Sequence, residues 1–235
     1  ITKQIARRVA INNGDMNSGD KTLENLLIKR KKIINHAKEK FNKVYEIIQQ
    51  IISEKGILNY TLVYCPEGLD EYQESTMKEY GKMLGMDMGL NIRYFVGDTP
   101  SKERKEVLES FANGETQAIL AMKCLDEGID VKRTENAILV ASSTNPRQYI
   151  QRRGRILRTH PDKLIASIHD LFVLPPFDLI HDDDDETKNR INSINKSLIK
   201  QELLRLDEFA SSSLNYVENK VLIRKYLDEY EIESP

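Results

Sequence analysis

The chain has 235 residues, of which 40% are hydrophobic and 31% charged, and its formal net charge is −2. Its mean hydropathy of −0.52 and the absence of a long apolar run predict a soluble protein with no membrane partner, membrane span or signal peptide. The two cysteines, Cys65 and Cys124, exclude a disulfide framework and lack metal-ligand spacing, which favours a cytoplasmic location. Any nucleic-acid binding must come from local basic patches, because the net charge is near zero.

The first part of the chain precedes the regular alternation of strands and helices. Residues 1–22 are polar and predict an irregular lead-in. From residue 23 to about residue 53, apolar residues at three- and four-residue steps predict one helix, which Gly56 ends. The basic run at residues 29–32 favours a solvated face over a nucleic-acid contact. Because the chain begins at Ile1, we expect it to be a fragment of a longer protein.

Short apolar runs then alternate with helical patterns. The expected strands are residues 60–65, 91–96, 117–122, 136–141 and 164–172, and the expected helices are residues 68–86, 101–111 and 145–158. This alternation predicts an α/β fold with an open, mainly parallel sheet covered by helices on both faces. Ligands of such sheets gather at the carboxyl ends of the strands.

The chain is predicted to have three parts. Residues 1–56 form the lead-in and a linking helix, residues 57–176 the sheet domain, and residues 177–235 a C-terminal helical extension packed on it. The extension consists of two helices separated by a serine triplet at residues 211–213. The acidic run at residues 182–186 is interpreted as a helix start stabilised by the macrodipole, in preference to a metal site.

Residues 145–158 are the most cationic segment, with five arginines and no acid. Asn145 and Pro146 favour a helix start there. A helical wheel places Tyr149, Ile150, Ile156 and Leu157 on an apolar side, and Arg147, Gln151, Arg155 and Arg158 on the opposite side with Gly154 beside them. The guanidinium fork suits phosphate oxygens, but a solvated basic face fits the spacing equally well. Arg153 falls on the apolar side, so either Gly154 disturbs the helix or Arg153 has an acidic partner.

Two loops at expected strand ends are further candidates. In residues 122–131, Gly128 permits a close backbone approach and Asp130 can accept a hydrogen bond from a ribose hydroxyl. The alternative is an ordinary loop with a surface acid. In residues 97–104, the start of a helix offers backbone N–H groups to a phosphate, and simple N-capping is an equally good interpretation.

The order of these segments resembles that of the superfamily-two helicases. Residues 151–158 (QRRGRILR) resemble their motif VI, residues 126–131 (DEGIDV) motif V and residues 62–66 (LVYCP) motif IV. Between motifs IV and V, the family usually has a spaced series of Gly, Arg, Phe and Gly, which Gly97, Arg104, Phe111 and Gly114 match. The residues of motifs V and VI are most similar to those of the bacterial DEAD/DEAH-type branch related to the XPB-like and type III restriction translocases. The resemblance covers residues 60–172 and implies the second, RecA-like motor domain, the helicase C-terminal domain.

The resemblance implies roles for the matching residues. Arg155 and Arg158 are expected to act as arginine fingers on the γ-phosphate of ATP, exposed and unpartnered in an open cleft. The nucleotide interface would include Gln151, Arg152, Gly128 and Asp130. The nucleic-acid contacts would include Tyr64, Cys65, Pro66, Gly97, Asp98 and Lys123.

The 235 residues contain no Gly-x-x-x-x-Gly-Lys-Ser/Thr phosphate loop and no Asp-Glu-x-His/Asp box. In the family, the first motor domain carries both, together with Mg²⁺. The resemblance therefore implies ATP and Mg²⁺ in the full-length protein, held mainly by that N-terminal motor domain, and neither cofactors nor hydrolysis in this chain alone. The expected partners are that domain and nucleic acid, with DNA favoured over RNA.

Two other functions compete with this interpretation. One is a nucleic-acid- or protein-binding module that keeps a helicase fold without motor activity. The other is an unrelated α/β nucleotide-binding enzyme, which is weakly supported because the four histidines are scattered and no nucleophile–base pair or metal cluster is evident.

Overall fold

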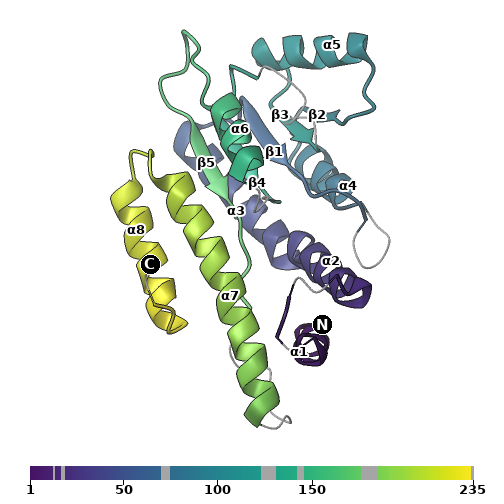
Figure 1. Ribbon diagram of the computed structural model, residues 1–235. Helices are drawn as coiled ribbons and strands as arrows, with labels where there is room; N and C mark the ends of the chain where they lie inside the picture. Colours follow the sequence, from purple (N-terminus) through teal and green to yellow (C-terminus); the bar gives the residue numbers. More distant parts are fainter. Residues whose placement is uncertain are drawn as a thin grey trace. The chain divides into compact units, whose positions relative to one another are not determined.

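The computed structural model describes residues 1–12, 14–16, 19–69, 75–122, 131–141, 146–175 and 185–233, with the backbone alone at residues 146–149 and 152. The chain forms two compact units (Figure 1). One is Asn35–Phe172, and the other combines Ile1–Ile34 with Val173–Pro235. Within the described ranges, no helix has the length and apolarity that crossing a bilayer requires.

Five parallel strands form the sheet of the unit Asn35–Phe172, in the order β2-β3-β1-β4-β5. The strands are β1 (Thr61–Tyr64), β2 (Ile92–Phe95), β3 (Ala118–Ala121), β4 (Asn136–Leu139) and β5 (Ser167–Asp170). Every residue of β1, β3 and β4 is buried, as expected for central parallel strands. The predicted open, parallel α/β sheet is confirmed.

Helices cover this sheet (Figure 1). They are α3 (Lys38–Lys55), α4 (Thr76–Gly81), the π-helix η1 (Lys82–Asp87), α5 (Ser101–Ala112) and α6 (Pro146–Ile156). Residues of α3, α4 and η1 form one buried cluster with alternate residues of the central strands, among them Val63, Leu120 and Ile138. The intervening residues Leu62, Ile119 and Ala137 are also buried and point to the opposite face.

The structure groups α3 with the sheet, whereas the predicted boundary at residue 57 left it in the linking segment. The reason is packing, because Val44, Ile47, Ile48 and Ile51 of α3 belong to the core of the sheet unit. The helix expected at residues 68–86 begins only at Thr76, and residues 70–74 lie outside the described part. Gly81 allows β2 to approach α4 closely, since a Cβ there would lie 1.8 Å from Tyr94 Oη.

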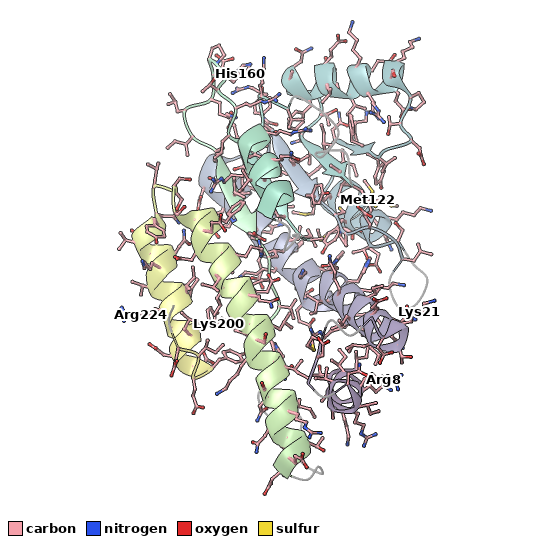
Figure 2. All side chains as sticks on the ribbon, viewed as in Figure 1. Arg8, Lys21, Met122, His160, Lys200 and Arg224 are labelled. Carbon is pink, nitrogen blue, oxygen red and sulfur yellow. The ribbon has the colours of Figure 1, made fainter. Side chains whose placement is uncertain are left out.

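The second unit contains α1 (Thr2–Ile11), α2 (Lys21–Asn35), α7 (Asp185–Ala210) and α8 (Tyr216–Glu229). The helix α7 contacts both α1 and α8. Arg8 on α1 (Figure 2) donates to Asp20, with Nε 2.5 Å from Oδ2. Asp20 also accepts the backbone N–H of Thr22 at 2.9 Å, and the Arg8 guanidinium holds the pKa of this carboxyl far below its usual range. One side chain therefore links α1 to the start of α2.

Two predictions for the N-terminal part are wrong. Residues 1–22 are not irregular, because α1 forms there and buries Ile5 and Ala6. The single helix predicted over residues 23–53 is two helices, since Ala37 takes an extended conformation (ψ 129°) between α2 and α3. His36 fixes this break, donating from Nε2 to Glu67 O (3.1 Å) and accepting from Thr76 Oγ1 at Nδ1 (2.5 Å). The apolar periodicity continues across the break and therefore does not reveal it. That the C-terminal extension packs on the sheet domain stays a prediction.

Candidate functional site

The carboxyl ends of the strands lie level at one edge of the sheet. Tyr64, the last residue of β1, aligns with Ala121 of β3 and with Leu139 of β4. The chain passes from β3 to β4 across β1, so this edge is the topological switch point at which open α/β sheets bind ligands. The predicted residues Tyr64–Pro66 and Gly97–Asp98 both lie at this edge, after β1 and β2. Lys123, Gly128 and Asp130 lie outside the described residues.

The side chains of Tyr64, Cys65 and Pro66 are buried. Cys65 belongs to the core, where its backbone N–H donates to Ala121 O at 2.8 Å. The sequence pattern of this motif therefore largely reflects packing at the end of β1. A nucleic-acid contact here has to come from the backbone or from the loop that follows.

Arg104 of α5 holds the turn that follows β2. Its Nε donates to Thr99 O at 2.7 Å, its Nη2 donates to Gly97 O, and its guanidinium lies 5.8 Å from the centre of the Phe95 ring. Gly97 and Asp98 remain exposed. The residue before α5 is Pro100, and the structure has no side-chain cap there, so the interpretation as simple N-capping is wrong. This turn and the first N–H groups of α5 form an accessible surface at the carboxyl edge.

The cationic segment forms the helix α6 without interruption. Across Gly154, the Leu157 N–H donates to Arg153 O at 2.9 Å, so the glycine does not disturb the helix. Arg153 is half-buried and interacts with another residue, and that its partner is acidic stays a prediction. Apart from its chain neighbours and the backbone of α6 itself, no heavy atom of the described residues lies within 4 Å of the place that a Cβ of Gly154 would occupy.

The exposure of the α6 side chains agrees only in part with the helical wheel. Gln151, Gly154 and Arg158 are exposed and Ile156 is fully buried, as predicted. Ile150 and Leu157 are 44% and 45% exposed, so the predicted apolar side is wrong at these positions. Ile156 is the one described side chain of α6 that is fully buried, whereas its neighbours are exposed or half-buried. The side chains of Arg147, Tyr149 and Arg152 lie outside the described part.

The two predicted arginine fingers are less isolated than expected. Arg158 is exposed, whereas Arg155 is half-buried, and both interact with other residues. The expectation that they are unpartnered is therefore wrong. Arg155 lies one residue before the end of α6, and the Arg158 N–H lies 3.4 Å from Arg155 O, so the chain keeps a turn between them.

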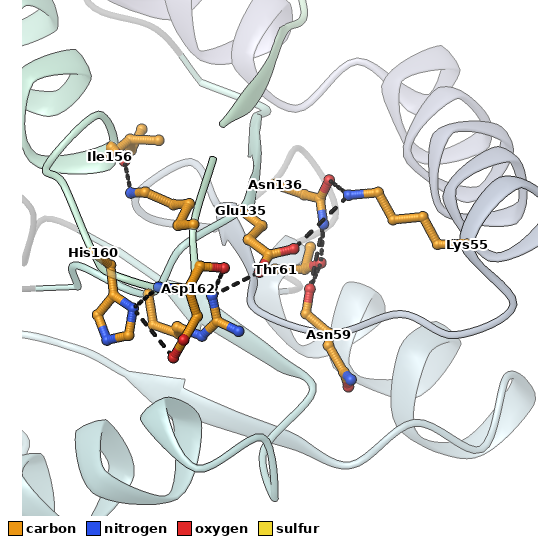
Figure 3. Close-up of polar contacts among 10 residues, drawn as sticks. Lys55, Asn59, Thr61, Glu135, Asn136, Ile156, His160 and Asp162 are labelled. Carbon is orange, nitrogen blue, oxygen red and sulfur yellow. Dashed lines mark hydrogen bonds and ion pairs between the residues drawn. The ribbon is translucent and has the colours of Figure 1, made fainter. Parts of the chain in front are cut away.

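The structure places these arginines toward the amino ends of the strands. The helix α6 connects β4 to β5 along the chain. Because these strands are parallel, α6 must run from the carboxyl end of β4 back to the amino end of β5. At its end, Lys163 Nζ donates to Ile156 O at 2.9 Å, and Arg133, just before β4, donates to Asp162 O at 2.7 Å (Figure 3). The predicted residues therefore form two groups at opposite edges of the sheet. Sequence reasoning missed Lys163 and Arg133, which belong to no periodic pattern and meet only in the fold.

No metal centre is evident in the described ranges, where no group of three or more His, Cys, Asp or Glu side chains is arranged to hold an ion. Asp185 and Glu186 lie in the first turn of α7, as the macrodipole interpretation of this acidic run predicts. Asp182, Asp183 and Asp184 lie outside the described residues.

Comparison with known proteins gives consistent matches. A segment of 60 residues is 43% identical to the DNA 3'-5' translocase XPB2 of Sulfurisphaera tokodaii, covering 26% of this chain and 14% of that protein. A segment of 80 residues is 32% identical to the putative ATP-dependent helicase IRC3 of Saccharomyces cerevisiae, covering 34% of this chain and 12% of that protein. The chain thus matches only a small part of the length of these relatives.

Among solved structures, domain 2 of the DEAD-box helicase Mss116p bound to an RNA duplex is similar with a TM-score of 0.44 and 15% identity, over 84% of this chain and 77% of that one. Residues 39–160, more than half of the chain, match the family described as the helicase conserved C-terminal domain. The chain belongs to this helicase C-terminal domain family.

Proposed function

We propose that the chain is the second motor domain of an ATP-dependent helicase or translocase that acts on DNA rather than RNA. The observation that carries this proposal is the open face of α6. Gly154 and Arg155 lie three and four residues after Gln151 on a continuous helix, and the exposed Arg158 follows its end. A glycine within a helix costs about 1 kcal/mol relative to alanine. No described side chain fills the space at Gly154, and in this proposal that space admits the bound nucleotide.

The chemistry follows from the charge that develops in phosphoryl transfer. Arg155 and Arg158 would stabilise the γ-phosphate oxygens in the transition state, which is worth roughly 10³–10⁵ in rate. Gln151 and Arg152 would complete this interface, and Gly128 and Asp130 would couple it to the nucleic acid. ATP and Mg²⁺ would be held mainly by an N-terminal motor domain, because these 235 residues carry neither the phosphate loop nor the acidic box.

The carboxyl edge of the sheet would contact the nucleic acid strand. The exposed Gly97–Asp98 turn and the first N–H groups of α5 suit backbone phosphates, and this mode of binding carries no sequence information. Lys123, the backbone after β1 and the exposed loop that follows it would extend this surface. DNA is favoured because the residues of the motifs are most similar to those of DNA translocases, and XPB2 is described as one.

The test uses the full-length protein with Arg155→Ala and Arg158→Ala. We expect each change to lower nucleic-acid-stimulated ATP turnover by about 10³-fold or more, with strand binding kept within about threefold. Arg224→Ala is the matched control, because Arg224 is an exposed arginine on α8 (Figure 2), and it should change neither activity. Unchanged turnover in the Arg155 and Arg158 variants would support a binding module on a helicase fold. Robust turnover by this chain alone would also refute the proposal.

A further inference from the structure

We propose that Lys163 and Arg133 are positioning residues for Arg155 and Arg158, because they fasten the end of α6 and the exit loop after it (residues 157–163) to the amino end of β4. This inference rests on the proposed function and adds residues that lie outside motif VI. Figure 3 shows Ile156, His160 and Asp162 on one side of the polar network that carries it.

Lys163 holds the backbone between the two arginines. Its Nζ donates to Ile156 O at 2.9 Å, and Ile156 is the last residue of α6. The final carbonyls of a helix lack intrahelical partners, and a cation there also complements the helix dipole. The Lys163 N–H closes the exit loop by donating to His160 O at 3.0 Å. The ammonium group thus fixes the peptide that directly follows Arg155 and precedes Arg158 by two residues.

Arg133 fixes the other side of the exit loop. Its Nη1 donates to Asp162 O at 2.7 Å and pairs with Glu135 Oε1 at 2.9 Å. Its guanidinium carbon lies 4.0 Å from the centre of the Tyr60 ring, and only 14% of its side chain is exposed. Tyr60 and Glu135 immediately precede β1 and β4, so Arg133 ties the exit loop to the amino ends of two buried central strands.

The charge of the Lys163 ammonium is affected by its surroundings in two opposite ways. Burial lowers the pKa of Lys163, while the Glu135 carboxylate acts in the opposite direction. Removing cations from water costs free energy, so partly buried cations are weak evidence for stability alone. Their contacts converge here on the backbone that carries two residues with a proposed role in catalysis. Misplacing a catalytic group by about 1 Å can cost about 10²-fold in rate, so such anchoring has a direct kinetic consequence.

The experiment measures steady-state ATP turnover of the full-length protein with saturating nucleic acid. We expect Lys163→Met and Arg133→Met each to lower kcat by about 10–100-fold while the KM for ATP and the strand affinity change by less than about threefold. Lys163→Arg keeps the charge and the donor and should recover most of kcat. If Lys163→Met fails to fold, Arg133→Lys replaces it as the test. This change keeps the charge but loses the planar fork that holds Asp162 O and Glu135, so kcat should still fall.

Lys55→Met is the matched control. Lys55 belongs to the same network, with Nζ 3.3 Å from Asn136 Oδ1 and 4.0 Å from Glu135 Oε2. Figure 3 shows it on the side away from Ile156 and His160, without an interaction drawn to the exit loop. We expect Lys55→Met to leave kcat unchanged.

A combined-variant comparison separates positioning from general stabilisation. In an Arg155→Ala/Arg158→Ala background, Lys163→Met should cause little further loss of kcat, because both residues that it positions are gone. The inference would be overturned if the fold-losses of kcat in the separate variants multiplied in the combined variant. It would also be overturned if strand binding and thermal stability fell as much as kcat. If Arg158→Ala abolishes turnover but Lys163→Met and Arg133→Met do not lower it, only the positioning role fails. If Arg155→Ala and Arg158→Ala leave turnover unchanged, the proposed function fails, and the inference fails with it.

Discussion

Tyr60 lies where three distant parts of the sheet unit meet, and replacing it by leucine tests the energetics of the amino edge. The Phe111 ring of α5 meets the Tyr60 ring edge-on, with the centroids 6.0 Å apart and an interplanar angle of 85°. Arg133 covers the ring at 4.0 Å. Tyr60 also has a positive φ of 50°, which is strained for a residue with a side chain. Tyr60→Leu keeps the Cβ and therefore keeps this strain, so the change reports mainly on the two ring contacts.

The expected loss follows from these contacts. An edge-to-face aromatic pair contributes about 0.5–1.5 kcal/mol beyond burial, and a cation–π contact contributes about 0.5–2 kcal/mol. We therefore expect Tyr60→Leu to lower the free energy of unfolding by about 1–3 kcal/mol. For a chain of this size, each kcal/mol lowers Tm by about 2–4 °C.

Urea unfolding of Tyr60→Leu, Arg133→Met and the double mutant measures the effect and its origin. The coupling energy between the two positions should be about 0.5–2 kcal/mol. Tyr45→Leu is the control, because Tyr45 of α3 is 44% exposed, and it should change stability by less than about 0.5 kcal/mol. A loss for Tyr60→Leu no larger than for Tyr45→Leu, or simple additivity with Arg133→Met, would refute the reasoning.

Three further predictions concern the core, pH and the α6 glycine. Leu120→Ala, at a fully buried site in β3, should cost about 2–5 kcal/mol in urea unfolding, whereas Leu164→Ala, at a 97% exposed site, should cost less than about 0.5 kcal/mol. Burial lowers the pKa of His169 below its ordinary 6.5, against the opposing effect of Glu54, so the unfolded chain binds more protons between the two pKa values. Stability should therefore fall on acidification below about pH 6.5, by at most about 1.4 kcal/mol per pH unit from this group, and His169→Gln should flatten the profile; identical profiles would contradict this. Gly154→Ala should raise the free energy of unfolding by about 0.5–1 kcal/mol and lower ATP turnover of the full-length protein, and undiminished turnover would count against a close approach at this glycine.

Much of the sheet unit was predictable because its signals are local. The central strands are short apolar runs bounded by polar turns, and the sequence places all five strands within a few residues of their observed ends. The helix α5 ends before Gly114, whose φ of 79° is a conformation that glycine adopts without strain. The cationic helix α6 and the motif resemblance are likewise properties of contiguous residues. For this reason the sequence alone was sufficient to identify the family.

Tertiary structure alone decided the features that depend on contacts between distant residues. The helix α1 forms where local composition predicted none, with Ile5 and Ala6 buried and with α7 as its neighbour. Tyr64 and Cys65 match a functional motif, yet they are buried because β1 is the central strand. Arg133 contacts Tyr60, which lies more than 70 residues earlier in the chain, and it also contacts the exit loop. Such contacts arise from the strand order, because adjacent strands bring remote residues to one edge, and no local pattern encodes which ones meet.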